Sequence, residues 1–218
     1  MMQIKVVRQI LEWNENCHEE VKRYLKDRGV TLINIMGSPG AGKTTFILNL
    51  INELKKYGIN VGVIEGDVEG TIDAEKMQQE GVPVVQLNTQ GACHIEAMSI
   101  KNIIKDVSLE NIDILIVENI GNLVCPAEFD IGDTLKIALL SVPEGDDKVV
   151  KYPLMFTRAD ALILTKYDML KYFDFKVNEL EQQLKIRNKE AKLFKVNSME
   201  EGESSEFAKW LVEKINNK

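Results

Sequence analysis

Residues 37–44 read GSPGAGKT, which matches the phosphate-loop pattern G-x-x-x-x-G-K-[ST] in full. The apolar run at residues 31–36 predicts a strand before this segment, and the pattern at residues 44–57 predicts a helix after it. Glycines between a strand and a helix let backbone N–H groups turn toward phosphates, and the start of the helix favours negative charge. A glycine-rich turn that binds nothing is the alternative, but the full match in this context predicts a nucleoside triphosphate site.

The side chains in and near this loop have distinct predicted roles. Lys43 would neutralise the β- and γ-phosphates, and the Thr44 hydroxyl would take one position on Mg²⁺. Two acids that follow predicted strands, Asp67 and Glu118, could hold Mg²⁺ directly or through water, and they rank above Asp73, a further candidate near the γ-phosphate. Acids at strand ends are often only helix caps, which is the alternative for all three. The residues predicted to contact the phosphates are Gly37, Gly40, Ala41, Gly42, Lys43, Thr44 and Thr45.

Apolar runs and helical patterns alternate along the rest of the chain. The clearest buried strand is residues 112–117, IDILIV, which is apolar except for Asp113. Strands separated by helices predict an α/β fold with a mostly parallel central sheet and helices on both faces, the fold of P-loop NTPases. Further strands are predicted at residues 61–65, 82–87, 137–142, 161–164 and 191–196, and helices at residues 71–80, 95–107, 174–187 and 205–215.

The N-terminal segment is predicted to be an amphipathic helix that precedes the main domain. Apolar residues recur at helical spacing between residues 4 and 25, on a segment that is otherwise polar. This pattern divides the chain into a helix at residues 1–28 and a P-loop domain at residues 29–218. The apolar face of the helix could dock a partner protein, or it could simply pack on the core.

Composition limits the class of protein. The chain has 218 residues, 44% hydrophobic and 28% charged, which suits one globular domain. A net charge of −7 argues against a broad nucleic-acid surface. The N-terminus lacks the apolar stretch of a signal peptide, and no apolar run is long enough to span a bilayer. Three cysteines without a secretory signal favour the reducing cytoplasm over a disulfide framework.

The segment TKYD at residues 165–168 resembles the N-K-x-D guanine motif of GTPases. A carboxylate at Asp168 can accept hydrogen bonds from the guanine N1–H and 2-amino groups, whereas adenine offers no such pair of donors. The usual asparagine is Thr165 here, and a lysine and an aspartate at a strand end are common in any α/β protein. The late position in a P-loop fold favours guanine, with Lys166 and Asp168 as its contacts, and residues 196–198 could also border the base.

Cys93, His94 and Cys125 form a second constellation, in loops that leave the carboxyl ends of predicted strands. Thiolate and imidazole are preferred ligands of Zn²⁺ and also suit Ni²⁺. Three ligands leave a tetrahedral site incomplete, so a second chain or water could supply the rest. By spacing alone, unrelated buried cysteines would be the better interpretation. The pair Cys17–His18, with no other ligand nearby in sequence, is predicted to be structural.

Together these segments resemble the HypB family of hydrogenase nickel incorporation proteins, P-loop GTPases of the SIMIBI class. The shared text is GSPGAGKTT, EGDVEGTIDAEKM, LNTQGACHIEA, IVENIGNLVCPAEFDIG, PEGDDKVVKYP and LTKYD. The resemblance implies a nickel or zinc site between subunits at Cys93, His94 and Cys125, and so reverses the interpretation from spacing alone. It also implies GTP or GDP with Mg²⁺, a homodimer that depends on nucleotide or metal, a small nickel-carrying accessory protein, and a hydrogenase large subunit as client. The chain lacks the Cys-rich or His-rich N-terminal tract of some members, which argues against nickel storage.

The path from Glu118 to Cys125 suggests a mechanism. Glu118 would sense Mg²⁺ and the γ-phosphate, Gly121 would let the loop rearrange, and Cys125 would move relative to the other two ligands, so that slow GTP turnover times metal transfer.

Three alternatives remain from the residues. A urease metallochaperone would carry Cys-Pro-His, whereas Ala127 follows Cys125 and Pro126 here. A small-molecule kinase would need an Arg-rich lid, but only Arg158 and Arg187 lie beyond residue 28. A nucleotide-gated interaction module without catalysis is the third alternative.

Overall fold

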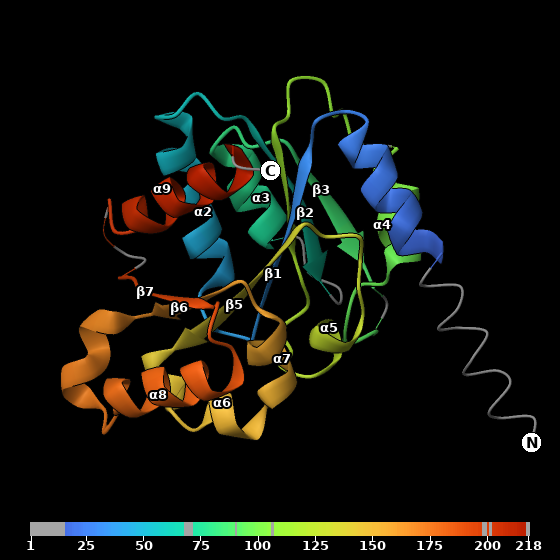
Figure 1. Cartoon of the computed structure of the whole chain (residues 1–218). Coiled ribbons are helices and arrows are strands. Elements are labelled where there is room, and N and C mark those ends of the chain that lie inside the picture. Colours follow the sequence, from blue (N-terminus) through green and yellow to red (C-terminus); the bar gives the residue numbers. More distant parts are fainter. Residues whose placement is uncertain are drawn as a thin grey trace, which may run out of the picture.

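The computed structural model describes residues 16–67, 72–89, 91–105, 107–197, 200 and 202–216. Seven parallel strands form one sheet in the order β3-β2-β4-β1-β5-β6-β7, with helices on both of its faces (Figure 1). This arrangement confirms the predicted fold class. The strands are β1 Thr31–Gly37, β2 Val61–Asp67, β3 Val84–Asn88, β4 Ile114–Glu118, β5 Leu135–Ser141, β6 Ala161–Thr165 and β7 Lys192–Lys195.

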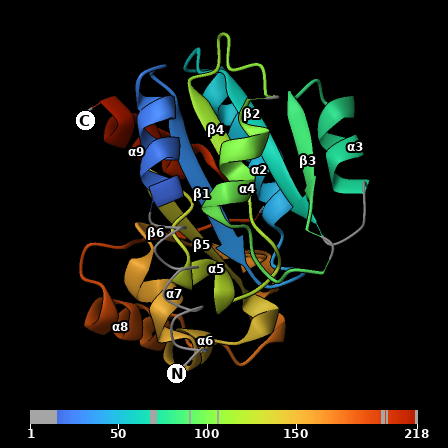
Figure 2. The same cartoon turned by 90° about the vertical axis from the view of Figure 1, so that its right-hand side faces the viewer.

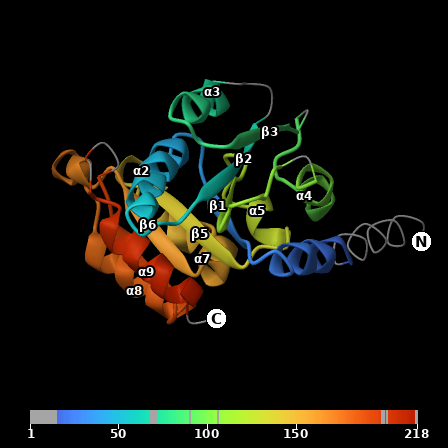
Figure 3. The same ribbon diagram turned by 90° about the horizontal axis from the view of Figure 1, so that it is seen from above.

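The helices divide between the two faces of the sheet, as Figures 2 and 3 show from two further sides. One face is covered by α2 and α9, and the other by the helix at residues 16–26 and by α4, α7 and α8. The helices are α2 Lys43–Lys55, α3 Ile72–Gln79, α4 Ala97–Ile103, α5 Cys125–Glu128, α6 Lys148–Lys151, α7 Pro153–Arg158, α8 Val177–Arg187 and α9 Ser205–Asn216, with 3₁₀ turns η1 Val142–Glu144 and η2 Tyr167–Tyr172.

Strand β4 illustrates why the sheet is buried on both sides. Ile114 and Ile116 point into the core beneath α2 and α9, while Leu115 and Val117 point into the core beneath α4. All four side chains are fully buried. A strand without a polar face can be stable only between two layers of helices, as its apolar run predicted.

Several predicted boundaries differ from the structure. The helix predicted at residues 95–107 is shorter, because Glu96 is extended and caps α4, which begins at Ala97. Strand β5 begins two residues earlier than predicted, at Leu135. Val142, predicted as the last residue of that strand, instead begins η1, and residues 143–160, which carried no predicted element, form the rest of η1 with α6 and α7. These elements have three to six residues each, too short to show a helical repeat.

The described part of the N-terminal helix packs on the core. Val21 and Leu25 are buried against β1 and β4 side chains. The approach is close at Gly132, where an added Cβ would lie 2.7 Å from Val21 and 2.9 Å from the His18 carbonyl oxygen. Residues 1–15 of the predicted helix lie outside the described residues, so the division at residue 28 and a docking role stay predictions. Among the described residues, no helix has the length and apolar character needed to cross a membrane.

Candidate nucleotide and metal sites

The phosphate loop joins β1 to α2 at the carboxyl edge of the sheet. Gly40 and Gly42 adopt the left-handed backbone conformation, with φ of 76° and 89°, which a side chain would strain. The loop borders a pocket of about 630 Å³. Among the residues that line this pocket are Gly40, Gly42, Lys43, Thr44, Thr45, Asp67, Asp73, Glu118 and Lys166, all named above from the sequence.

Lys43 is held inside this pocket. Its side chain is buried, and Nζ lies 3.4 Å from the Gly37 carbonyl oxygen and 3.3 Å from that of Ser38. Burial lowers the pKa of this lysine, and the carboxylates of Glu118 and Glu144 partly oppose that shift. The ammonium group is therefore poorly solvated, and the oxygens of a bound phosphate would be strong partners for it.

The predicted Mg²⁺ ligands meet beside the lysine. The Thr44 hydroxyl donates a hydrogen bond of 2.9 Å to Glu118 Oε1, while Glu118 Oε2 is buried without a hydrogen-bond partner among the described residues. Burial raises the pKa of Glu118 to about 7. Asp67 lines the same pocket at the end of β2. A hydroxyl and two carboxylates are hard oxygen donors, which suits Mg²⁺.

Asp73 makes an ion pair within its own helix. Its carboxylate pairs with Lys76 Nζ at 3.0 Å on α3, although both residues line the pocket. Asp73 therefore has a partner within one helix, and its rank below Asp67 and Glu118 as a Mg²⁺ ligand stays a prediction.

Glu65 is a site residue that the sequence reasoning missed. The register of β2 and β4 places it directly opposite Glu118, and its side chain is buried and lines the pocket. Burial, together with the Glu118 and Asp67 charges, raises the pKa of Glu65 to about 8. A charged residue inside the otherwise apolar strand VGVIEGD was the available signal, because such residues are rarely buried without a purpose.

At the predicted base end, Thr165 ties β6 to the phosphate loop. Its buried hydroxyl donates a hydrogen bond of 2.6 Å to the Ala41 carbonyl, and Lys166 Nζ donates one of 2.8 Å to the Gly40 carbonyl. The threonine in place of asparagine therefore still anchors this segment. Asp168 is exposed in η2 and lies outside the residues that line the phosphate pocket. Asn197 bonds to Glu200, and Ser198 lies outside the described residues.

Replacing Asp168 by asparagine is expected to lower GTP affinity by about 10- to 100-fold and to improve binding of xanthosine triphosphate. The physical reason is that an amide donates to the xanthine 2-carbonyl but cannot accept from both guanine donors. Competition of both nucleotides against a fluorescent GTP analogue measures the change. Asp174→Asn, at an exposed position nearby, serves as the control. Unchanged GTP preference in Asp168→Asn would remove this residue from the base site.

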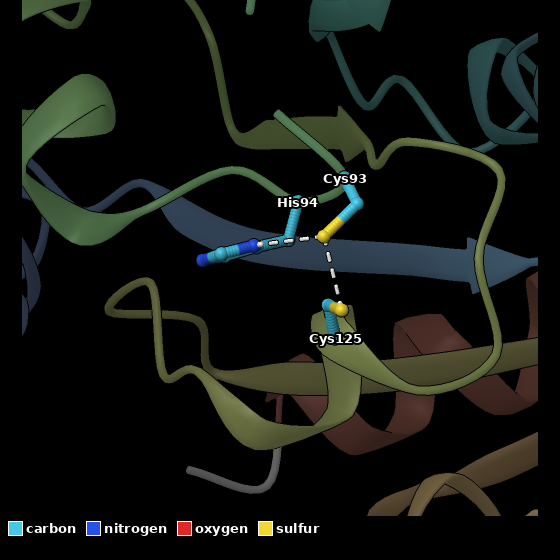
Figure 4. A group of neighbouring side chains, drawn as sticks. All are labelled: Cys93, His94 and Cys125. Atoms are coloured by element: carbon cyan, nitrogen blue, oxygen red, sulfur yellow. Dashed lines mark hydrogen bonds between the residues drawn. The ribbon is translucent and has the colours of Figure 1, made fainter. Parts of the chain in front are cut away.

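Cys93, His94 and Cys125 lie together one loop away from the phosphates (Figure 4). Cys93 Sγ is 3.0 Å from Cys125 Sγ and 3.6 Å from His94 Nδ1, and the three ligand atoms lie within 4.8 Å of one another. Cys93 is exposed in the loop between β3 and α4. Cys125, predicted in a loop, is instead the first residue of α5. The hydrogen bond with Cys93 raises the pKa of the Cys125 thiol.

His94 is fixed by its surroundings. Its ring stacks on Phe129 at a centroid distance of 4.0 Å, and Nε2 lies 3.7 Å from Glu96 Oε1. Burial lowers the pKa of His94, which favours the neutral imidazole that binds metals. The other pair stays apart from this cluster: Cys17 is buried in the core, and His18 contacts Glu19.

The segment between Glu118 and Cys125 contacts both sites. Asn122 N–H donates to the Gly37 carbonyl at 3.1 Å, and its side-chain amide donates to the Cys93 carbonyl at 3.3 Å. Gly121 packs on the phosphate loop, because an added Cβ would lie 2.9 Å from Pro39 N. A side chain at this position would collide with Pro39, and this close approach is the reason that a glycine is required here. Its predicted role in loop rearrangement stays a prediction.

Asn119 makes a second connection at the end of β4. Its side-chain oxygen accepts hydrogen bonds from the N–H groups of Ile95 and Ile120, at 3.3 and 2.9 Å. Its amide donates to the Asn34 side chain at 3.1 Å, and both asparagines are buried. The residue after His94 is thus held directly by the strand that ends in Glu118.

Comparison with known proteins gives the family of the chain. The family model described as "CobW/HypB/UreG, nucleotide-binding domain" matches residues 31–195. The Hydrogenase/urease maturation factor HypB of Helicobacter pylori strain J99 is 43% identical, over 97% of this chain and 88% of the relative. The chain belongs to the CobW/HypB/UreG family, on the HypB branch. This membership does not fit the small-molecule kinase considered above.

Two solved HypB structures resemble the fold. The Helicobacter pylori HypB crystallised in complex with nickel superposes with a TM-score of 0.88 at 38% identity, covering 94% of this chain and 95% of that one. HypB from Archaeoglobus fulgidus gives a TM-score of 0.85 at 29% identity, covering 94% of this chain and 99% of that one. The HypB fold therefore extends over nearly the whole chain.

Proposed function

We propose that this chain is a GTP-hydrolysing metallochaperone that assists nickel insertion during maturation of [NiFe]-hydrogenase. The observation that carries the proposal is the double contact of Asn122, which bonds to the phosphate loop at Gly37 and to Cys93 in the thiol and imidazole cluster. The names of the curated relatives and the nickel complex of the Helicobacter pylori protein support the assignment. The name of that relative includes both hydrogenase and urease, so a role in the maturation of a second nickel enzyme is compatible with the proposal.

The nucleotide side of the proposal assigns GTP and Mg²⁺ to the pocket. Lys43 would bind the phosphates, and Thr44, Asp67 and Glu118 would hold the cation, which when bound neutralises charge on the phosphate oxygens. The buried, unpartnered Glu118 Oε2 supports a cation there. No glutamine or arginine is among the residues that line the described pocket. The usual water-positioning and charge-stabilising groups are thus missing from its lining, which supports slow turnover.

The metal side of the proposal assigns Ni²⁺, or Zn²⁺ in its place, as cargo at Cys93, His94 and Cys125. Two thiolates bound to one tetrahedral ion stand about 3.8 Å apart, so the sulfurs need to open only slightly from 3.0 Å. Three ligands leave a position open, which a second chain can fill in a homodimer. Val124, next to Cys125, is 45% exposed and offers an apolar contact for that second chain.

Coupling between the two sites would let the nucleotide state control when the metal ion is released. A change of the phosphate loop on GTP hydrolysis would reach Cys93 through Asn122 and reach the backbone beside His94 through Asn119. Metal affinity would then differ between the GTP and GDP states. The released ion would pass to the hydrogenase large subunit, with a small nickel-carrying accessory protein as the second partner.

Cys125→Ala is expected to weaken Ni²⁺ and Zn²⁺ binding by about 100-fold or more, because loss of even an outer partner of a ligand costs 10- to 100-fold. Metal titration against a chromogenic competitor measures metal affinity and stoichiometry, once in the presence of GDP and once with a non-hydrolysable GTP analogue. Light scattering on the same samples measures dimer formation. Cys17→Ala is the matched control, since that cysteine lies outside the cluster.

The same titration on Asn122→Ala tests the coupling. This variant retains all three ligands but loses the side-chain bond to Cys93, so it is expected to bind metal with a smaller difference between the two nucleotide states. Equal metal affinity of the wild-type protein in its GTP and GDP states would contradict the coupling. Normal metal binding by Cys125→Ala would contradict the metal site itself.

A further inference from the structure

Cys93 and Cys125 are 32 positions apart in sequence, yet their sulfurs lie 3.0 Å apart. The bond length of a disulfide is about 2.05 Å, so an approach of about 1 Å would join them. We propose that these two cysteines form a reversible intramolecular disulfide when the metal-free protein meets a hydroperoxide. Nothing in the proposed nucleotide or nickel chemistry requires this modification.

The backbone holds the two thiols near each other without an ion. Asn122 donates to the Cys93 carbonyl, and the Asn122 side-chain oxygen accepts the N–H of Val124, the neighbour of Cys125. Cys93 is exposed and Cys125 is partly exposed, so a small oxidant can reach the pair. Cys17, the third cysteine, is buried at 5% exposure and is not part of the cluster of Cys93, His94 and Cys125.

The chemistry takes two steps and is balanced. The Cys93 thiolate attacks one oxygen of hydrogen peroxide, the O–O bond breaks, and Cys93 becomes a sulfenic acid as hydroxide leaves and is protonated to water. Cys125 then attacks the Cys93 sulfur, the S–S bond forms, the S–O bond breaks, and a second water leaves. The two thiols supply two electrons to the peroxide, and their two protons end in the two waters. A dithiol reductant reverses the reaction by exchange.

The disulfide would prevent the site from binding a metal ion. Metals bind the thiolate, and sulfurs joined in a disulfide no longer offer one, so His94 would be the only remaining member of the cluster. This consequence rests on the proposed function, whereas formation of the disulfide does not. Bound metal would in turn protect the thiols, because both sulfurs would be occupied as ligands.

The test uses the full chain, reduced and freed of metal, treated with hydrogen peroxide at near-equimolar amounts. Free thiols are expected to fall from three to one per chain. Trypsin separates the cysteines into peptides of residues 9–22, 77–101 and 106–136, and the last two are expected as one linked species that lacks two hydrogens. Cys17→Ser should retain the link, and Cys93→Ser and Cys125→Ser should each lose it. Dithiothreitol should restore three thiols.

Metal binding, measured on the same samples, separates this inference from the proposed function. Oxidised protein is expected to lose its capacity for Zn²⁺ and to regain it on reduction, and protein loaded with Zn²⁺ should oxidise more slowly. A disulfide between two chains, a link that includes Cys17, or oxidation without any link would overturn the inference while leaving metal binding by the reduced protein intact. A 93–125 link in a protein that binds no metal when reduced would instead contradict the proposed function.

Discussion

Lys43→Ala is expected to lower the rate of GTP hydrolysis by about 100-fold or more, since removal of a single preorganised charge-stabilising group commonly costs that much. The side chain is buried beside the loop carbonyls and lines the phosphate pocket, so its ammonium group is already in place before a phosphate binds. Phosphate release from the purified variant, measured over hours because turnover is slow, gives the rate. Binding of a fluorescent GTP analogue separates lost affinity from lost chemistry.

Lys55→Ala is the matched control, because it removes an exposed lysine from the last turn of the same helix α2. Its hydrolysis rate should equal that of the wild-type protein. If Lys43→Ala hydrolysed GTP at the wild-type rate, the measured activity would not come from this pocket. If the wild-type protein bound GTP without hydrolysing it, the non-catalytic nucleotide-gated module would be the better description.

Glu65→Gln is expected to stabilise the nucleotide-free protein at alkaline pH by roughly 2–4 kcal/mol and to change its stability little at pH 5. Burial opposite Glu118 raises the pKa of Glu65 from 4.5 to about 8. The native state therefore keeps a proton that the unfolded chain releases near pH 4.5. Since the native state binds more protons across this window, the free energy of unfolding falls as pH rises from about 4.5 to about 8.

A glutamine cannot ionise, so the variant lacks this loss of stability. Urea unfolding of both proteins at pH 5, 7 and 9, without metal or nucleotide, gives the difference at each pH. Glu53→Gln is a control of similar burial, but Glu53 is paired with Lys56 at 2.6 Å, and its replacement should not stabilise the protein. A difference between wild type and Glu65→Gln that is the same at pH 5 and pH 9 would contradict the assigned cause.

The sequence predicted most of the features that are encoded by residues close together in the chain. The phosphate loop, the apolar strand 112–117 and the alternation of strands and helices each leave a pattern within a dozen residues. The parallel sheet then places the carboxyl ends of β1, β2, β3 and β4 at one edge. For this reason the predicted acids Asp67 and Glu118 line one pocket, and Cys93, in the loop after β3, meets Cys125 at the start of α5.

What the sequence could not predict depends on register and on side-chain packing. Glu65 belongs to the phosphate site only because β2 pairs with β4 in a register that places it beside Glu118. Thr165 reaches the Ala41 carbonyl across 124 positions of sequence. Residues 142–160 form turns and helices too short for a periodic signal.

By itself, therefore, the sequence determined the fold class and the phosphate loop, because each is encoded in residue types at short spacing. The three candidate metal ligands followed from the resemblance to the HypB family, since their spacing alone favoured unrelated cysteines. Only the tertiary structure decided how these parts connect. The Asn122 N–H donates to the Gly37 carbonyl, its side-chain amide donates to the Cys93 carbonyl, and Gly121 lies against Pro39. The backbone groups that accept these hydrogen bonds are brought into place by the packing of distant segments. Hydrogen bonds of that kind carry no sequence signature, since every residue except proline has the same backbone donor and acceptor.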